Sequence, residues 1–302
     1  MKKKATNSTK LHHVLPLGDS TIIALSNGKV EMALTEYSDK QLTGEAFTQE
    51  EKRLLKEHHI SLDKDGNFFV PLHSFVVQNA GKTYLVDTGS GGLIPPMGSN
   101  GFLIEALAEA QIKPEDIDAI IMTHLHPDHC AGLLTSTGEK QFPNATLHVC
   151  DIEYEYWNNA KAEAETPEAL RGWFTTAQEQ VKPYKSVMKL FSLTEQTLFP
   201  GISTLPLPGH TPGHTGFLIE ESAGVNGLLI WGDILHSQTF ECPHPEWALQ
   251  FDVDTDKAIQ TRIDIMQHLA KSGTLVAGMH VDFPGYGHVK AKGNAYEMIQ
   301  AE

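Results

Sequence analysis

The chain has 302 residues, 40% of them hydrophobic, which is ample for a large buried core in one domain or two. Its 23 basic and 38 acidic side chains give a formal charge of -15, which argues against a nucleic-acid partner held through phosphate contacts. Three cysteines argue against a disulfide framework, so a reduced, cytoplasmic location is expected. The basic start Met1–Lys4 is followed by polar residues, and we expect neither a secretion signal nor a membrane span.

Short apolar runs predict several strands in the first part of the chain. The predicted strands are residues 21–25, 68–70, 75–77 and 83–86, and a turn at residues 79–82 joins the last two. A capping-box pattern at residues 48–51 predicts a short polar helix that continues to about His58. A second helix, with Leu103, Leu107 and Ala110 on one face, is expected to end before Pro114. The apolar residues 117–122 that follow predict a buried strand.

The second half of the chain continues this alternation of strands and helices. It is expected to contain helices within residues 151–182, strands at 204–207, 216–219, 228–231 and 274–278, and a helix between Asp254 and Gly273. No linker separates the halves, so we expect a single domain spanning residues 1–302. Strands and helices that alternate in blocks along the chain predict an α/β fold in which two sheets pack face to face with helices outside.

The most specific feature is the run from Thr123 to Gly132, in which His124, His126, Asp128 and His129 fall within six consecutive positions. Nitrogen and oxygen donors of this kind suit zinc and other first-row divalent metals. The first two histidines can face one cation, and the aspartate and last histidine a second. Because the run follows the predicted strand at 117–122, it would lie where α/β proteins usually place their sites. The run predicts a two-metal site and metal-assisted hydrolysis.

Three further polar residues follow apolar runs and are candidate ligands. His210 lies in a glycine-rich segment after residues 204–207, Asp233 comes directly after residues 228–231, and His280 follows residues 274–278. His214, in the same segment as His210, is either structural or a contact to a ligand. Five histidines on polar stretches are expected to be solvated: His12, His13, His58, His59 and His268.

The order of these residues resembles the metallo-β-lactamase superfamily, and the resemblance covers nearly the whole chain, beginning at Leu85–Gly89. It implies an αβ/βα sandwich of two mixed sheets with a dinuclear site at the sheet edges. Position by position, it implies that His124, His126 and His210 hold the first metal. It further implies that Asp128, His129 and His280 hold the second metal, and that Asp233 bridges both.

A closer resemblance, to the methyl parathion hydrolase and lactonase branch, lies in Gly209–Thr215 and in Phe283–His288 with Gly293 and Tyr296. That branch includes phosphotriesterases, arylesterases and lactone hydrolases. Lactonases of the superfamily often place a tyrosine three residues beyond the bridging aspartate, where this chain has His236. Its imidazole either has a catalytic role, donating a hydrogen bond to a carbonyl or leaving group, or only lines the pocket. Position 126 is histidine, where di-iron oxygen-reducing relatives carry glutamate, and this favours hydrolysis over redox chemistry.

The resulting prediction is a hydrolase of lactones, aryl esters or organophosphate triesters that uses a hydroxide bridging two divalent metal ions, with zinc the expected metal. Asp128 is expected to orient the nucleophile and move its proton, and Asp87 to hold a ligand imidazole. A small-molecule substrate is expected, with no nucleic-acid or membrane partner. By analogy with the branch, a homodimer is reasonable.

Two alternatives stay open. A thioester hydrolase of the glyoxalase II kind needs a basic site for glutathione, for which Lys290 and Lys292 are candidates. A metal-dependent binding protein without turnover would be indicated by a missing ligand, and none is missing here. Cys130 is interpreted as a small buried side chain. Four large aromatic side chains are expected in the core rather than in a substrate pocket: Trp157, Phe240, Trp247 and Phe283.

Overall fold

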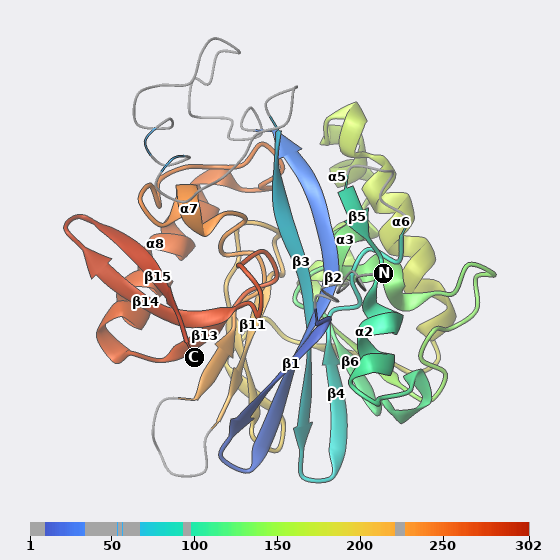
Figure 1. Cartoon of the computed structure of the whole chain (residues 1–302). Helices are drawn as coiled ribbons and strands as arrows, with labels where there is room; N and C mark the ends of the chain where they lie inside the picture. Colours follow the sequence, from blue (N-terminus) through green and yellow to red (C-terminus); the bar gives the residue numbers. More distant parts are fainter. Residues whose placement is uncertain are drawn as a thin grey trace, which may run out of the picture.

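The computed structural model describes residues 10–33, 53, 56, 67–92, 98–220 and 227–301. Two mixed sheets face each other at the centre, and helices lie on their outer sides (Figure 1). This architecture confirms the predicted αβ/βα sandwich. Within the described residues, no helix has both the length and the apolar character that a membrane crossing requires.

The first sheet has eight strands in the order β1-β2-β3-β4-β6-β7-β8, with β5 paired to β2. Their bounds are β1 (His12–Leu17), β2 (Ser20–Ala33), β3 (Asn67–Asn79), β4 (Lys82–Val86), β5 (Gly98–Asn100), β6 (Ala119–Ile121), β7 (Thr146–Cys150) and β8 (Met188–Phe191). The second sheet has seven strands in the order β15-β14-β13-β12-β11-β10-β9. Their bounds are β9 (Gln196–Phe199), β10 (Ile202–Pro206), β11 (Thr215–Ile219), β12 (Leu228–Ile230), β13 (Leu275–Ala277), β14 (Tyr286–Lys292) and β15 (Ala295–Gln300).

The helices cover the outer face of each sheet (Figure 1). Those beside the first sheet are α2 (Leu103–Glu109), α3 (Pro127–Cys130), α4 (Asp151–Trp157), α5 (Ala160–Glu165) and α6 (Gly172–Val181), with short 3-10 turns η2 (Pro114–Asp116), η3 (Ala131–Leu133), η4 (Glu168–Leu170) and η5 (Lys182–Tyr184). The second sheet is covered by α8 (Thr255–Ser272), and α7 (Gln238–Glu241) packs through Phe240 against Phe68 of β3. As predicted, the Asp254 side chain caps α8, and Gly273 ends it with a left-handed φ of 71°.

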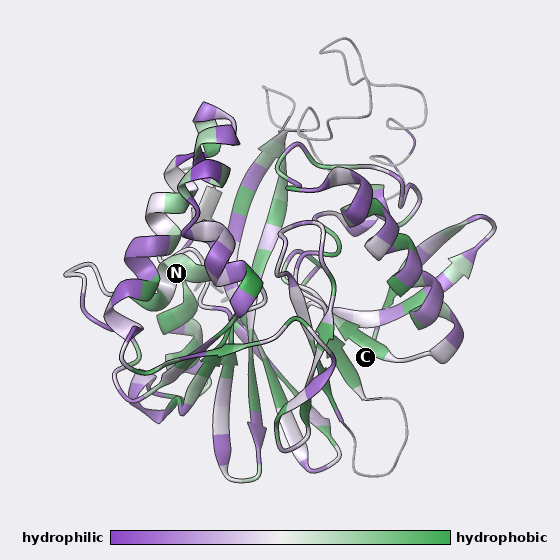
Figure 2. Ribbon diagram, turned by 180° about the vertical axis from the view of Figure 1, so that it is seen from behind, coloured by the Kyte–Doolittle hydropathy of each residue, from purple (hydrophilic) through white to green (hydrophobic). Residues whose placement is uncertain are grey.

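The central strands of the first sheet are buried on both faces, which explains their apolar character. In β2, Ile22 and Ala24 pack between the sheets with residues such as Phe217. The alternate residues Ile23 and Leu25 pack under the helices on the other face. Hydrophobic residues accordingly follow the strands, and hydrophilic residues gather on the outer sides of the helices (Figure 2).

The strands that lead into the site all end at one edge of the sandwich. In the first sheet β4, β6, β7 and β8 run parallel to one another. In the second sheet β12 and β13 are parallel, and β10 has the same direction because β11 is antiparallel to both β10 and β12. The segments after β4, β6, β10, β12 and β13 therefore meet at the carboxyl ends of the strands.

Some predictions about the elements need correction. The strands expected at residues 68–70 and 75–77 are one strand, β3. It continues through Pro71 because β4 pairs with β3 only over residues 75–79, and a missing N–H is tolerated where a strand has a single partner. Seven strands were not predicted: β1, β5, β7, β8, β9, β14 and β15. The helix expected at residues 48–58 lies outside the described residues except for Arg53 and Lys56.

The expectation of solvated histidines is wrong for two residues of β1. His12 and His13 are half-buried because β1 pairs with β2. Nδ1 of His12 lies 2.9 Å from Oε1 of Glu109, and Nδ1 of His13 lies 2.8 Å from the hydroxyl of Tyr286. His268 is exposed, as predicted. His58 and His59 lie outside the described residues.

Candidate metal centre

The segment after β6 carries four of the predicted ligands on a short turn. His126 has an extended backbone with ψ of 153°, and the one-turn helix α3 begins directly after it. Pro127 occupies the first position of α3, where its missing N–H costs nothing. This local structure leaves His124 and His126 before the helix and places Asp128 and His129 on it. The two pairs of donors therefore project from different backbone conformations within one short segment.

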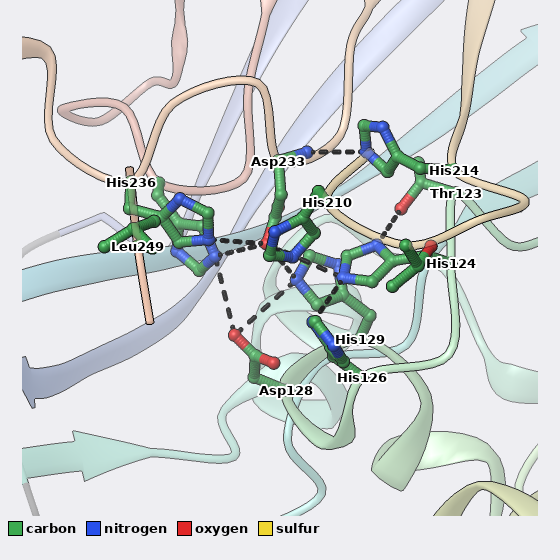
Figure 3. Close-up of polar contacts among 12 residues, drawn as sticks. Thr123, His124, His126, Asp128, His129, His210, His214, Asp233, His236 and Leu249 are labelled. Atoms are coloured by element: carbon green, nitrogen blue, oxygen red, sulfur yellow. Dashed lines mark hydrogen bonds and ion pairs between the residues drawn. The ribbon is translucent and has the colours of Figure 1, made fainter. Parts of the chain in front are cut away.

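The carboxylate of Asp233, just after β12, lies at the centre of the site (Figure 3). Its Oδ2 atom is 3.1 Å from Nε2 of both His129 and His280. It is 3.5 Å from Nε2 of His210 and 3.7 Å from Nε2 of His124. Residues from the ends of three other strands, β6, β10 and β13, therefore converge on one oxygen atom.

The structure brings all seven predicted metal-binding residues together in two adjoining groups. In each group the donor atoms lie within 4.8 Å of one another: His124, His126 and His210 in the first, and Asp128, His129, Asp233 and His280 in the second. The first group is closed by a 3.1 Å approach of His126 Nδ1 to His124 Nε2. Asp128 Oδ2 lies 3.5 Å from Nε2 of both His129 and His280.

Four of the imidazoles are held with Nε2 free to act as a donor to a cation, because Nδ1 of each is occupied. Nδ1 of His129 donates to Asp87 at 2.8 Å, and Nδ1 of His210 donates to Asp252 at 2.8 Å. Nδ1 of His280 donates to a backbone carbonyl at 2.9 Å. The Thr123 hydroxyl donates to Asp87 and therefore accepts from His124 Nδ1 at 3.0 Å. Such partners set the tautomer and direction of metal-binding histidines.

The charge state of the site also suits divalent cations. Burial lowers the pKa of His124, His126 and His210 well below its usual value, so these imidazoles are neutral. Burial alone would raise the pKa of Asp233, but the charges of His129 and His280 hold it well below its usual range. Among the described residues, Nε2 of His129 and of His210 has no hydrogen-bond partner. Neutral imidazoles and ionised carboxylates form a donor set that binds divalent metal ions.

Burial lowers the pKa of His280, but the carboxylates of Asp233 and Asp128 raise it above the usual value. His129 shows the same effect more strongly. A cation that binds beside this ring must therefore displace a proton, which makes metal affinity depend on pH.

Asp87 holds the imidazole of a candidate ligand, His129, and this contact agrees with the prediction from its place at a strand end. Besides the bond from His129, its carboxylate accepts the Thr123 amide at 2.8 Å and the Thr123 hydroxyl at 2.6 Å. Its backbone has a φ of 57°, which is uncommon for a non-glycine residue and frequent at functional sites.

Two supporting carboxylates could not be found from the sequence. Asp252 lies 42 residues after His210, in an irregular segment before α8, where only Asp254 carried a recognisable capping signal. Glu153 on α4 connects the two segments that carry the first group of ligands. Its Oε1 accepts the Leu125 amide at 2.9 Å, and its Oε2 accepts the Thr211 hydroxyl at 2.7 Å and the Gly213 amide at 3.0 Å.

His214 has a structural role. Its Nδ1 donates to the Leu207 carbonyl at 2.8 Å, and its Nε2 accepts the Asp233 amide at 2.9 Å. Burial lowers its pKa to about 4, which keeps Nε2 an acceptor. Gly232 is required here, because a Cβ at its φ of +62° would lie 2.3 Å from His214 Nε2. His214 therefore orients the backbone of Asp233.

His236 lies beside the centre and lines the adjoining pocket. Its Nε2 is 3.2 Å from Asp233 Oδ2, and its ring stacks on that of His280 with centroids 5.0 Å apart. The Glu241 carboxylate accepts the backbone amides of His236 and Ser237 at 2.6 and 2.7 Å. The ring is therefore held over the centre (Figure 3).

A cavity of about 430 Å³ opens above the centre. Its polar side is formed by His126, Asp128, Asp233, His236 and His280, and its apolar side includes Val30, Met32, Val70, Leu170, Trp173 and Phe251.

Four large aromatic side chains pack in the core instead of lining this cavity, as predicted: Trp157, Phe240, Trp247 and Phe283. The pocket aromatics Trp173 and Phe251 were not predicted. Cys130 is buried, as predicted, with its thiol near the Leu125 carbonyl.

Comparison with known proteins agrees with this geometry. Residues 68–271 match the model of the metallo-beta-lactamase superfamily. The crystal structure of the hydrolase AbOPH of the beta lactamase superfamily is 28% identical, with a TM-score of 0.87 over 98% of this chain and 99% of that one. AidC, a dizinc quorum-quenching lactonase solved with the product N-hexanoyl-L-homoserine, is 27% identical, with a TM-score of 0.84 over 97% of this chain and 99% of that one.

An N-acyl homoserine lactonase of Bacillus sp is 28% identical over 171 residues, which cover 50% of this chain and 59% of that protein. The chain thus matches less than two thirds of the length of this curated relative. The matched family model spans most of the chain, from β3 to α8, and includes all the residues that converge on Asp233 except His280. The chain belongs to the metallo-beta-lactamase superfamily.

Proposed function

We propose that this protein is a dinuclear metal-dependent hydrolase of lactones that carry an apolar acyl substituent, with aryl esters and organophosphate triesters as further substrates. One observation carries the proposal: the two groups of metal donors meet at Asp233 on the floor of a cavity whose opposite side is apolar. A polar reaction centre and an apolar wall suit a neutral substrate with a reactive carbonyl at one end. The similarity to AidC, a lactonase that binds an acyl homoserine product, supports this choice of substrate.

The proposed ligands divide between two cations. His124, His126 and His210 would hold one, and Asp128, His129 and His280 the other, with Asp233 contributing to both. Two such cations supply a water of lowered pKa as nucleophile and polarise the oxygen of a carbonyl or phosphoryl group. Zinc is the metal that we propose, since histidine and carboxylate donors suit it.

Asp128 and His236 have complementary roles in this proposal. Burial would raise the pKa of Asp128, but the charge of His129 lowers it well below its usual range, so the carboxylate is ionised. Asp128 also lines the cavity, where it can orient the attacking water and accept its proton. His236 lines the same cavity and can donate a hydrogen bond to the substrate carbonyl or to the leaving oxygen.

The cavity gives less support to a glutathione thioester as substrate. Among the described residues that line it there is no lysine or arginine to bind the glutathione carboxylates. Lys290 and Lys292 are exposed on β14, and Lys292 pairs with Glu297 at 2.9 Å. A binding protein without turnover is also less well supported, because the set of seven donors is complete.

Hydrolysis by the zinc-loaded protein tests the proposal. The panel is N-hexanoyl homoserine lactone, phenyl acetate, a diethyl aryl phosphate and a glutathione thioester, each assayed with and without a chelator. We expect the highest kcat/KM on the lactone, loss of turnover with the chelator, and two metal ions per chain by elemental analysis. His210→Ala should lose one metal and nearly all activity. Turnover that survives the chelator, or highest activity on the thioester, contradicts the proposal.

A further inference from the structure

A second cavity of about 280 Å³ adjoins the one above the centre. Leu170, Gln250 and Phe251 line both cavities, so they stand between them. Leu170 ends the short turn η4, and Phe251 lies in the irregular segment between α7 and α8. The side chains of Leu170 and Phe251 are half-buried, whereas Gln250 is exposed. The apolar part of the partition is therefore formed by one leucine and one phenylalanine.

The backbone beside Phe251 is held to the centre. The Asp252 carboxylate accepts His210 Nδ1 and the Leu249 amide, and the Val253 amide donates to the His210 carbonyl at 3.0 Å. The Phe251 ring lies with its centroid 5.4 Å from that of His236 and 6.1 Å from that of Trp173. With the backbone held on either side, the partition at this point consists of a side chain, which a substitution can remove without moving the ligands.

The second cavity is lined by apolar and polar side chains in similar measure, and its apolar part suits an uncharged alkyl chain. Tyr156, Ala162, Pro167 and Val253 contribute to its lining. Its charged residues are the carboxylates Glu165 and Asp252, and no lysine or arginine occurs among its described lining residues. Anionic groups are disfavoured there, and an alkyl chain would gain from burial.

We propose that Leu170 and Phe251 form a wall that limits the length of the apolar substituent a substrate can carry, and that the second cavity is the space a longer chain enters when this wall is reduced. The inference rests on the proposed function, because it assumes that the substrate lies in the cavity above the centre. Each buried methylene contributes about a fourfold gain in binding. The gain should continue along a series of acyl chains until the chain end meets the wall.

The test measures kcat/KM of the zinc-loaded protein on straight-chain N-acyl homoserine lactones, from butanoyl to tetradecanoyl. In the unaltered protein we expect kcat/KM to rise about fourfold per methylene up to a certain acyl-chain length, and to rise no further for longer chains. We call this chain length the break. Leu170→Ala and Phe251→Ala should move the break to longer chains. The ratio of long-chain to short-chain kcat/KM should rise about fifteenfold, as two further buried methylenes would produce. Leu170→Trp should move the break to shorter chains.

Leu190→Ala is the matched control, since Leu190 is an exposed leucine, 49% accessible, on β8 and away from both cavities. It should keep the profile of the unaltered protein. The same break in the unaltered protein and in all three wall variants overturns the inference, as does an equal shift in the control.

Failure of the proposed function can be recognised separately. If the protein hydrolyses no lactone of any length, calorimetric titration with the ring-opened N-acyl homoserines measures the affinity of the same chains without chemistry. A break in affinity that moves in the Leu170 and Phe251 variants supports the wall while the lactonase proposal fails. Affinities that show no such movement overturn the inference as well.

Discussion

At the scale of single residues, the Oδ2 atom of Asp233 explains the character of the site. The Nε2 atoms of His124, His129, His210, His236 and His280 all lie 3.1 to 3.7 Å from it. One carboxylate cannot satisfy so many buried ring nitrogens by hydrogen bonds alone, and buried polar groups without partners are costly. Cations between these groups would satisfy the lone pairs and the carboxylate together. The arrangement therefore suits divalent cations at this point.

His236 is the residue whose role is most readily isolated. His236→Phe keeps an aromatic ring between His280 and Phe251 but removes both ring nitrogens. We expect kcat/KM on the best lactone to fall about 100-fold, the usual contribution of a group that transfers or shares a proton, while two metals stay bound. His236→Tyr should recover part of the loss, because its hydroxyl can donate. Unchanged kcat/KM in His236→Phe assigns the ring to the pocket wall only.

Asp252 is expected to act through His210. Asp252→Ala removes the acceptor that holds Nδ1 of His210, and loss of such a partner typically lowers metal affinity about 10- to 100-fold. Competition with a chromophoric chelator measures the affinity of each of the two sites. If the contact acts on the first group alone, one of the two affinities should fall and the other should stay unchanged. Asp256→Ala, an exposed position on α8, should behave as the unaltered protein; equal affinities in the two variants contradict the assignment.

At the scale of elements, the site depends on how α4 connects two separate segments. The segment after β6 carries His124 and His126, and the segment after β10 carries His210. Strands from opposite sheets lead into them, so the sandwich alone does not set their spacing. Glu153 does so, because its buried carboxylate accepts hydrogen bonds from both segments.

Glu153→Gln tests this connection. The amide nitrogen of glutamine cannot accept, so at least one of the donors Leu125, Thr211 and Gly213 loses its partner inside the protein. We expect the free energy of unfolding to fall by about 1–3 kcal/mol. The first metal should also bind more weakly, because the distance between its ligand segments is less well held. Denaturant titration and metal competition measure the two effects, and Glu155→Gln, exposed on the same helix, is the control. Loss of stability with both metal affinities intact limits Glu153 to the fold.

At the scale of the whole molecule, buried histidines link stability to pH. Burial lowers the pKa of His73, His148 and His214 from 6.5 to about 4. The unfolded chain therefore takes up protons near pH 6.5 that the folded protein resists until about pH 4. The stability that these neutral rings contribute is present above pH 6.5 and is lost as the pH falls from 6.5 towards 4.

The metal-free protein should show this loss most clearly, since metal binding has its own pH dependence. A shift of this size corresponds to about 3 kcal/mol for a fully buried ring such as His73, and to less for the partly exposed His148. Urea titrations across this pH range measure the slope. His148→Gln should reduce the slope without affecting metal content, because His148 lies on β7 and is absent from both donor groups. If the slope stays the same in His148→Gln, His148 does not contribute to the pH dependence of the free energy of unfolding.

The sequence by itself determined the two buried layers and the donors at their edge. Continuously apolar runs predicted strands such as β4, β6, β12 and β13, because a strand buried on both faces leaves no room for polar residues. Strands with exposed residues were missed: β8 and β15 have few buried positions and so no clear pattern. The donors His124 to His129 could be predicted because covalent adjacency holds them together in any fold of that segment.

Apart from Asp87, the groups that support those donors, and the walls that surround them, were decided by the tertiary structure alone. Asp252 is separated from His210 by 42 residues, and Glu153 from Thr211 by 58, and neither contact has a local pattern. The structural role of His214 and the cavity positions of Trp173 and Phe251 likewise follow from how distant segments pack. Donors that lie within one short turn can be predicted from their spacing in the sequence. Hydrogen bonds and cavity linings formed by distant segments cannot, because these segments come together only when the two sheets pack against each other.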